Sequence, residues 1–260
     1  MQKVKYLLAF LCLCFCLSSC SKNDQKILRV VASPTPHSEM IEHLIPEMKK
    51  HGITLEVITL TDYLLPNKLV DEHEADANFF QHIPFLEHQK TEQGLQLEVL
   101  GKVHLEPMGI YSKTLSKGSD FTGKKVALPL DPSNESRALK LLQDAGLITL
   151  NPEGAETIHD IASNPYGLKF LEVDAAILPR LYDDFDLAVI PTNFALQVGL
   201  NPSQDALFLE SQDSPYANIL VINPSSTKKQ ELQILLDSLQ SEKMVHFIKD
   251  NYKGAIIPAK

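Results

Sequence analysis

Hydrophobic and polar residues follow two alternating patterns along the chain from residue 27 onward. Residues 27–32 form a short run of apolar and β-branched residues, which is typical of a buried strand. In residues 36–50 the apolar side chains recur every three or four positions, which predicts an amphipathic helix that ends at Gly52. The same succession is repeated downstream, so we expect an α/β protein.

The complete pattern divides into two series of strands and helices. Strands are expected at residues 27–32, 53–60, 75–80, 95–105, 108–112, 124–128, 168–173, 187–190, 207–210 and 217–222. Helices are expected at residues 36–50, 63–74, 84–91, 132–145, 175–182, 227–239 and 241–251. This alternation is typical of parallel sheets. We expect two lobes, one formed by residues 27–107 together with 211–260 and the other by residues 108–210.

The N-terminal segment has the pattern of a secretory signal. Two lysines precede an apolar stretch at residues 6–17, which is shorter than the roughly 20 apolar residues that a spanning helix needs. Residues 17–20 resemble a bacterial lipobox, whose cysteine is acylated. We expect residues 1–19 to be a signal peptide and residues 20–26 to be a polar tether lipidated at Cys20. The alternative is an ordinary signal peptide with an incidental cysteine.

Composition narrows the class of function. The 260 residues include 24 Lys and Arg against 33 Asp and Glu, a formal net charge of −9, so the chain lacks the basic surface that nucleic acid requires. The hydrophobic fraction of 44% is ample for a packed core. All 4 cysteines lie in the N-terminal segment, so none is left for a disulfide framework or a nucleophile in the body of the chain.

Motif searches favour a binding protein over an enzyme. Residues 118–125 approach a phosphate-binding loop, but Lys125 stands where Mg²⁺ requires Ser or Thr, so we interpret this segment as a surface turn. No G-x-S-x-G elbow occurs. The 9 histidines lack the spacing of a zinc site, and His104 is expected to be solvated. We therefore expect no catalytic residues, no metal and no cofactor.

Arg137 is the most informative charged residue. It lies near the start of the helix expected at residues 132–145, where unpaired N–H groups and the helix dipole favour an anion. Its planar guanidinium would bind a carboxylate with two hydrogen bonds. The alternative is an exposed arginine paired with Glu135 or Asp144, and spacing alone does not decide between the two.

Aromatic and amide side chains gather at the ends of three expected strands. Phe80, His82 and Phe85 lie at or just beyond the end of one strand, where α/β proteins bind ligands, although the same residues also suit a hydrophobic core. Asn193 and Asn218 lie in two later segments of this kind. Each asparagine is either a turn or cap residue or a source of a side-chain oxygen for an ammonium group.

Taken together, these segments resemble the NlpA-type lipoproteins. The matching motifs are the lipobox, Pro-His-Ser-Glu at 36–39, Asp-Ala-Asn-Phe-Phe-Gln-His at 76–82, Glu-Pro-Met-Gly-Ile-Tyr-Ser at 106–112 and Ser-Pro-Tyr-Ala-Asn at 214–218. The resemblance covers essentially the whole mature chain. It implies a periplasmic-binding-protein fold, in which two α/β lobes close on a small ligand in the cleft between them.

The resemblance also implies a ligand and its binding residues. The best-known family members are methionine-binding lipoproteins of an ABC importer. This implies L-methionine as ligand, an ABC permease as partner, and a monomer anchored by lipid to a membrane of the bacterial cell envelope. The matching Arg137 would hold the amino acid carboxylate, and Asn193 and Asn218 would fix the polar amino acid moiety. Side chains surrounding the thioether are implied at four positions: Tyr63, Phe80, His82 and Phe85.

Two departures from the family pattern leave the ligand open. Thr35 precedes Pro36-His37 where family members commonly carry glycine, so the backbone of this loop has less conformational freedom. Phe85 stands where relatives often have Tyr, so one hydroxyl is missing. Another apolar amino acid or a methionine-containing dipeptide is therefore an alternative ligand, and a surface lipoprotein without a transport role is an alternative function.

Overall fold

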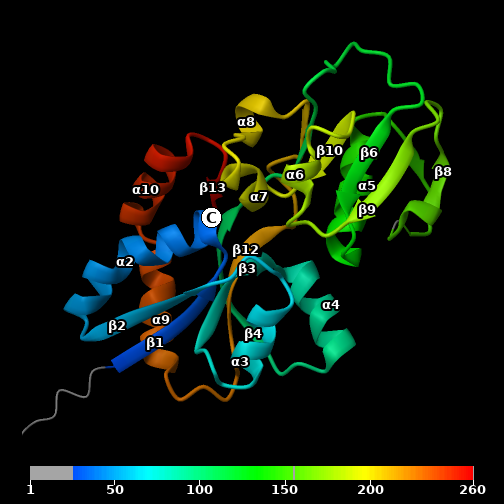
Figure 1. Cartoon of the computed structure of the whole chain (residues 1–260). Helices are drawn as coiled ribbons and strands as arrows, with labels where there is room; N and C mark the ends of the chain where they lie inside the picture. The colour runs from blue at the N-terminus through cyan, green and yellow to red at the C-terminus, as the bar shows by residue number, and fades with distance from the viewer. Residues whose placement is uncertain (1–25, 155, 260) are drawn as a thin grey trace, which may run out of the picture.

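Two β-sheets, each packed between helices, form the two halves of the molecule (Figure 1). The computed structural model describes residues 26–154 and 156–259. The expected signal peptide 1–19, the lipidation site Cys20 and all but the last residue of the tether 20–26 lie outside the described residues. Among the residues that are described, no helix combines the length and the apolar character needed to cross a membrane.

The first sheet has six strands in the order β13-β4-β12-β3-β1-β2. These strands are β1 (Lys26–Ala32), β2 (Ile53–Thr59), β3 (Ala77–His82), β4 (Glu98–Leu105), β12 (Ala217–Ile222) and β13 (Ile257–Pro258). β1 is parallel to β2 and β3, whereas β12 runs antiparallel between β3 and β4. In this register Asn218 lies opposite His82, so two predicted site residues come from adjacent strands.

Helices cover both faces of the first sheet. One face packs against η1 (Pro34–Ser38), α2 (Glu39–Lys50), α9 (Lys229–Leu239) and α10 (Glu242–Tyr252), and the other against α3 (Leu65–Asp71) and α4 (Ile83–Gln93). Val30 of β1 belongs to the first core and its neighbour Val31 to the second, and both are fully buried. Burial on both faces explains why this strand reads as a continuous apolar run.

The second sheet has five strands in the order β11-β5-β10-β6-β9. They are β5 (Gly109–Tyr111), β6 (Lys125–Pro129), β9 (Lys169–Val173), β10 (Leu187–Ile190) and β11 (Phe208–Leu209). Helix α5 (Pro132–Asp144) covers one face, and α6 (Leu178–Leu181) with α7 (Thr192–Gln197) covers the other. Short peripheral elements complete this half: β7 (Thr149–Leu150), η2 (Ile158–Asp160), β8 (Ile161–Ser163) and α8 (Pro202–Asp205).

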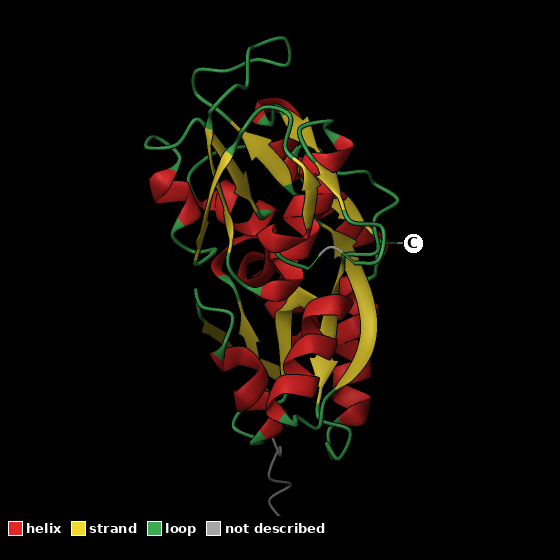
Figure 2. Cartoon of the chain, turned by 90° about the vertical axis from the view of Figure 1, so that its right-hand side faces the viewer, coloured by secondary structure: helices red, strands yellow, loops and turns green. Residues whose placement is uncertain are grey.

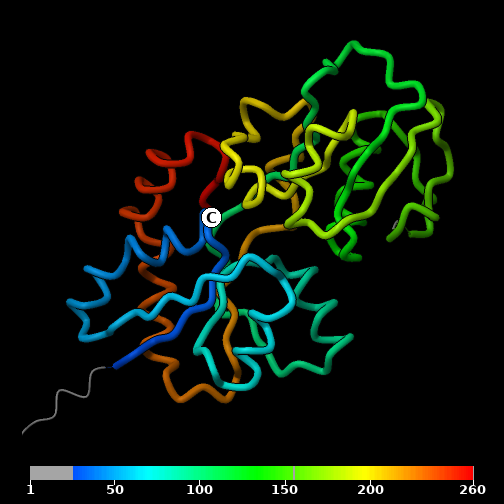
Figure 3. The backbone as a smooth tube through the Cα atoms, viewed as in Figure 1, coloured from blue at the N-terminus to red at the C-terminus, as the bar shows by residue number. Residues whose placement is uncertain are grey.

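The chain passes between the two halves twice. Residues 106–108 join β4 to β5, and residues 210–216 lead from β11 back to β12. In Figure 3 the passage 106–108 is green and the passage 210–216 is orange. The start of the first lies beside the end of the second, because Leu105 pairs with Ala217. Figure 2 shows the two halves stacked along the long axis of the molecule.

Several elements differ from the sequence prediction. The helix expected at 63–74 is only α3. Before it, the Asp62 carboxylate accepts the backbone N–H groups of Leu64 (3.0 Å) and Leu65 (2.9 Å), so residues 62–65 form a turn closed by this side chain. Tyr63 consequently lies in the preceding turn. The helix expected at 175–182 is reduced to α6, and α7 was not predicted at all.

Candidate functional site

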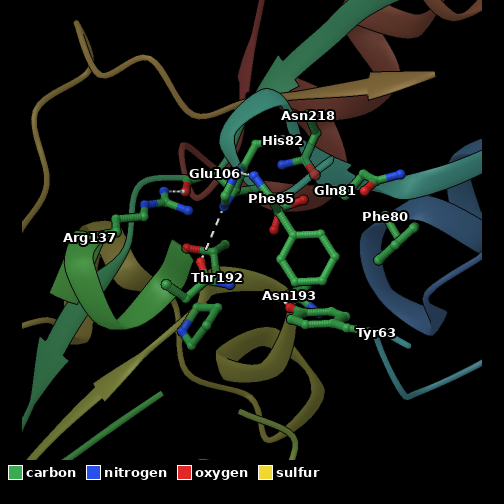
Figure 4. Close-up of a pocket in the computed structure, with 12 residues that line it drawn as sticks. Tyr63, Phe80, Gln81, His82, Phe85, Glu106, Arg137, Thr192, Asn193 and Asn218 are labelled. Atoms are coloured by element: carbon green, nitrogen blue, oxygen red, sulfur yellow. Dashed lines mark hydrogen bonds between the residues drawn. The ribbon is translucent and has the colours of Figure 1, made fainter. Parts of the chain in front are cut away.

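One pocket lies between the two halves and is lined by residues from both (Figure 4). It contains about 350 Å³ of space not filled by protein atoms, part of it open to solvent. All predicted ligand-binding residues are in its lining: Tyr63, Phe80, His82, Phe85, Arg137, Asn193 and Asn218. The lining also includes five residues that were not predicted: Gln81, Glu106, Asn134, Pro191 and Thr192.

The pocket forms where strands of the first sheet end opposite helices of the second half. Phe80 and His82 end β3, and Phe85 lies in the first turn of α4. Across the pocket, Arg137 lies in the second turn of α5 and Asn193 in the first turn of α7. The abrupt change from strand to helix therefore places polar and aromatic side chains at one meeting point.

Three aromatic rings form a wall of the pocket. The ring centroid of Tyr63 lies 5.7 Å from that of Phe80 and 5.6 Å from that of Phe85, and the two phenylalanines are 5.9 Å apart. Phe80 is 4% exposed and Phe85 2% exposed. Edge contacts at these distances fix the rings against one another, which leaves an apolar wall with little freedom to rearrange.

His82 links the two halves of the molecule. Its Nδ1 accepts the backbone N–H of Phe85 at 3.2 Å, so the proton of the neutral ring is on Nε2, which lies 3.2 Å from Oδ1 of Asn134 in α5. Burial, followed by the positive charge of Arg137, lowers the pKa of His82 to about 3. The imidazole is therefore a neutral hydrogen-bond donor at physiological pH.

Arg137 is buried, which excludes the exposed alternative considered from the sequence. Its partner is neither Glu135 nor Asp144 but Glu210, whose carboxylate it contacts through Nε (2.9 Å) and Nη2 (2.5 Å). Nη2 also donates to the backbone carbonyl of Glu106 at 2.7 Å, and the guanidinium lies 4.4 Å from the ring centre of Tyr216. The arginine thus reaches the pocket with its orientation already set.

The two asparagines differ in what they offer a ligand. Oδ1 of Asn193 accepts the hydroxyl of Tyr63 at 2.7 Å, while its Nδ2 is buried without a hydrogen-bond partner among the described residues. Asn193 therefore offers an N–H donor, whereas the alternatives drawn from the sequence were a turn or cap residue and a side-chain oxygen. Oδ1 of Asn218 lies 3.2 Å from Nε2 of His37 and retains a second lone pair.

A buried polar cluster behind the pocket was missed by the sequence analysis. His104, expected to be solvated, is 0% exposed, and its Nε2 lies 2.6 Å from Oε1 of Glu106. Nε2 of His37 lies 3.1 Å from the same oxygen. His37, His104 and Glu106 are the residues of the described chain whose donor atoms lie close enough together to hold a metal ion. The motifs that contain His37 and Glu106 were visible in the sequence, but their contact was not.

Solved structures of substrate-binding proteins share this architecture. The periplasmic substrate-binding protein of an ABC transporter from Coxiella burnetii matches with a TM-score of 0.83 at 39% identity, over 89% of this chain and 100% of that chain. A nutrient binding protein from Burkholderia cenocepacia bound to methionine matches with a TM-score of 0.85 at 37% identity, over 90% and 100%. The predicted two-lobed periplasmic-binding-protein fold is confirmed.

The sequence relationship identifies the family within this class. Residues 28–260 match the family model of the NlpA lipoproteins. The methionine-binding lipoprotein MetQ of Bacillus subtilis (strain 168) is 36% identical over 255 residues, covering 93% of each chain. The chain belongs to the NlpA lipoprotein family, as its motifs predicted.

Proposed function

We propose that this chain is a membrane-anchored substrate-binding protein that captures L-methionine and delivers it to an ABC permease. The pocket carries this proposal, because it combines a buried guanidinium with an aromatic wall. Arg137 suits the carboxylate of an amino acid. The rings of Tyr63, Phe80 and Phe85 suit a thioether, since each sulfur–ring contact contributes about 0.3–1.5 kcal/mol. Relatives named for methionine binding support the same ligand.

Capture proceeds by closure of two lobes around the ligand. We assign residues 27–107 and 211–260 to lobe 1 and residues 108–210 to lobe 2, in line with the strands that each sheet contains. The passages 106–108 and 210–216 act as the hinge. Two hydrogen bonds between the halves, Tyr63–Asn193 and His82–Asn134, favour the closed arrangement.

Lipid attached to Cys20 holds the protein in the bacterial cell envelope, on the outward or periplasmic side of a membrane. Each acyl CH₂ that enters the bilayer contributes about 0.8 kcal/mol, so several chains anchor the protein without a spanning helix. The protein acts as a monomer. Capture needs no catalytic residue, metal or cofactor, because binding and release of the ligand involve no covalent step.

Isothermal titration of the purified chain with a panel of amino acids tests this proposal. We expect L-methionine to bind with micromolar affinity or better, and Arg137→Ala to weaken binding by a factor of about 30 or more, because one member of a buried charge pair is lost. Lys124→Ala is the matched control, since Lys124 is partly exposed and pairs with Asp186 at 3.6 Å, away from the pocket. The absence of heat with L-methionine would reject the proposal; heat only with another apolar amino acid or with a dipeptide would reassign the ligand.

A further inference from the structure

Glu106 is a charged residue of the pocket that has no role in the proposal above. It follows β4 at the start of the passage 106–108, is 5% exposed and lines the pocket together with Arg137 and Asn218. A buried carboxylate is costly unless hydrogen bonds and charge partners compensate for the loss of water. The partners of Glu106 therefore indicate what the pocket is built to bind.

Two histidines lie next to one oxygen of this carboxylate. His104 Nε2 lies 2.6 Å and His37 Nε2 3.1 Å from Oε1. Nε2 of His37 faces two acceptor oxygens, Asn218 Oδ1 and Glu106 Oε1, so it carries the proton of the neutral ring, and Nδ1 accepts from Ser33 Oγ at 2.6 Å. The ring of Phe79 packs against both imidazoles, with centroid distances of 4.6 and 5.3 Å. The carboxylate is thus fixed before a ligand arrives.

The distances in this cluster are those of hydrogen bonds rather than of a shared metal. Two ligands of one zinc ion, each about 2.0–2.1 Å from it, stand roughly 3.3 Å apart in tetrahedral geometry. The contacts of Glu106 Oε1 with His104 at 2.6 Å and with His37 at 3.1 Å are shorter. An N–H donor accounts for the separation between His104 and Glu106, whereas the hydrogen bond of His37 Nε2 is with Asn218 Oδ1 at 3.2 Å.

The negative charge of Glu106 lacks an equal partner. Burial lowers the pKa of His37 to about 4 and that of His104 to about 3, so both rings are neutral at physiological pH. Arg137 gives two nitrogens to the carboxylate of Glu210 and hydrogen-bonds Glu106 through its backbone carbonyl. Its positive charge and the backbone N–H of Asn193 offset only part of the cost of burying the Glu106 carboxylate. Burial accordingly raises the pKa of Glu106. A cation that enters the pocket would supply the positive partner that the Glu106 carboxylate lacks.

We infer that Glu106 is the counter-ion of the ligand's ammonium group, so that the pocket selects free amino acids over analogues that lack this positive charge. The inference rests on the function proposed above. Arg137 and the unpartnered Nδ2 of Asn193 are donors for the ligand carboxylate, and Glu106 with Oδ1 of Asn218 accepts from the ammonium group. Donors at one end and acceptors at the other fit an amino acid zwitterion in one orientation.

A ligand pair and a variant pair form the experiment. L-methionine is compared with its 2-hydroxy analogue, in which a hydroxyl replaces the ammonium group and the carboxylate and thioether remain. Isothermal titration is carried out on the wild-type chain, on Glu106→Gln and on Glu98→Gln. Glu98 is the matched control because it lies on the same strand, β4, and pairs at the surface with Lys229 at 3.5 Å.

The wild-type chain should prefer L-methionine at least about 30-fold, because the analogue leaves a buried carboxylate unpaired. Glu106→Gln should lose most of this preference, with weaker binding of L-methionine and little change for the analogue, while Glu98→Gln should behave as wild type. An undiminished preference in Glu106→Gln would overturn the inference and leave methionine capture intact. A wild-type chain that binds no L-methionine overturns both. Should Glu106→Gln fail to fold, equal wild-type affinities for the two ligands would still refute the inference.

Discussion

Arg137 and Glu210 form a two-point ion pair beside the pocket, with Nε 2.9 Å from Oε1 and Nη2 2.5 Å from Oε2. The two side chains are only 4% and 10% exposed. Glu210 follows β11 at the start of the passage 210–216, so the pair connects α5 to this passage. The guanidinium that we propose as the carboxylate-binding group is therefore already oriented, which would reduce the entropy lost on binding.

Loss of Glu210 should destabilise the fold. Glu210→Gln leaves the buried guanidinium of Arg137 without a negative partner, and we expect a loss of about 3–5 kcal/mol in the free energy of unfolding, measured with urea. The double variant Arg137→Met/Glu210→Met should be more stable than Glu210→Gln, because no unpaired charge remains, yet it should not bind L-methionine. Losses of stability in Arg137→Met and in Glu210→Met that add up to the loss in the double variant would contradict this coupling.

The hydroxyl of Tyr63 should contribute to ligand affinity through closure. Tyr63→Phe removes the 2.7 Å hydrogen bond to Asn193 but keeps the aromatic wall. We expect L-methionine to bind about 2- to 12-fold more weakly, since one hydrogen bond contributes about 0.5–1.5 kcal/mol. Tyr166→Phe, a substitution of the same kind against Phe121 in the second half, is the control for loss of a tyrosine hydroxyl. An unchanged titration of Tyr63→Phe would show that this contact between the halves does not assist binding.

Stability should depend on pH through the buried histidines. The pKa of His104 is about 3 in the folded chain against 6.5 for the unfolded residue. Between these values the unfolded chain binds a proton that the folded chain does not, so the contribution of His104 to folding becomes less favourable as pH falls. Relative to His104→Gln, the wild-type free energy of unfolding should decrease by about 1.4 kcal/mol per unit from pH 6 to pH 4.

Urea unfolding of both chains at several pH values measures this difference. His246→Gln, a substitution of an exposed histidine, controls for the change of residue type. Curves for wild type and His104→Gln that run parallel over this range would mean that His104 is not neutral in the folded chain.

Removal of Cys20 should separate anchoring from binding. Cys20→Ala should release the protein from the membrane fraction, because the acyl chains can no longer be attached. Its titration with L-methionine should match that of the wild-type chain, since the pocket lies far along the sequence, in residues 63–218. Immunoblots of membrane and soluble fractions provide the measurement, and retention in the membrane fraction would disprove the assigned anchor.

Local sequence patterns were sufficient to predict much of the pocket lining. Phe80, His82 and Phe85 lie where a buried strand passes into a helix, and this transition is visible in the order of apolar residues and prolines. The α/β class followed from the same alternation. The shorter α3 could not be foreseen, because a turn at residues 62–65, closed by the Asp62 side chain, replaces the first residues of the periodic pattern.

Contacts between distant residues could not be predicted. Helix spacing offered Glu135 and Asp144 as partners of Arg137, but the partner is Glu210, which the second sheet brings alongside α5. His104 was expected to be solvated because its sequence neighbours include polar residues. It is buried because β12 and β13 flank β4 on both sides. Its hydrogen bond to Glu106 offsets the free-energy cost of burying the polar imidazole.

Native mass spectrometry of the purified chain tests ligand capture most directly. The protein is unfolded and refolded to remove any bound molecule, and its mass is compared before and after L-methionine is added. We predict a 1:1 complex whose mass exceeds that of the refolded chain by one methionine, and loss of that complex in Arg137→Ala. A bare mass in the wild-type chain at every methionine concentration would contradict the account.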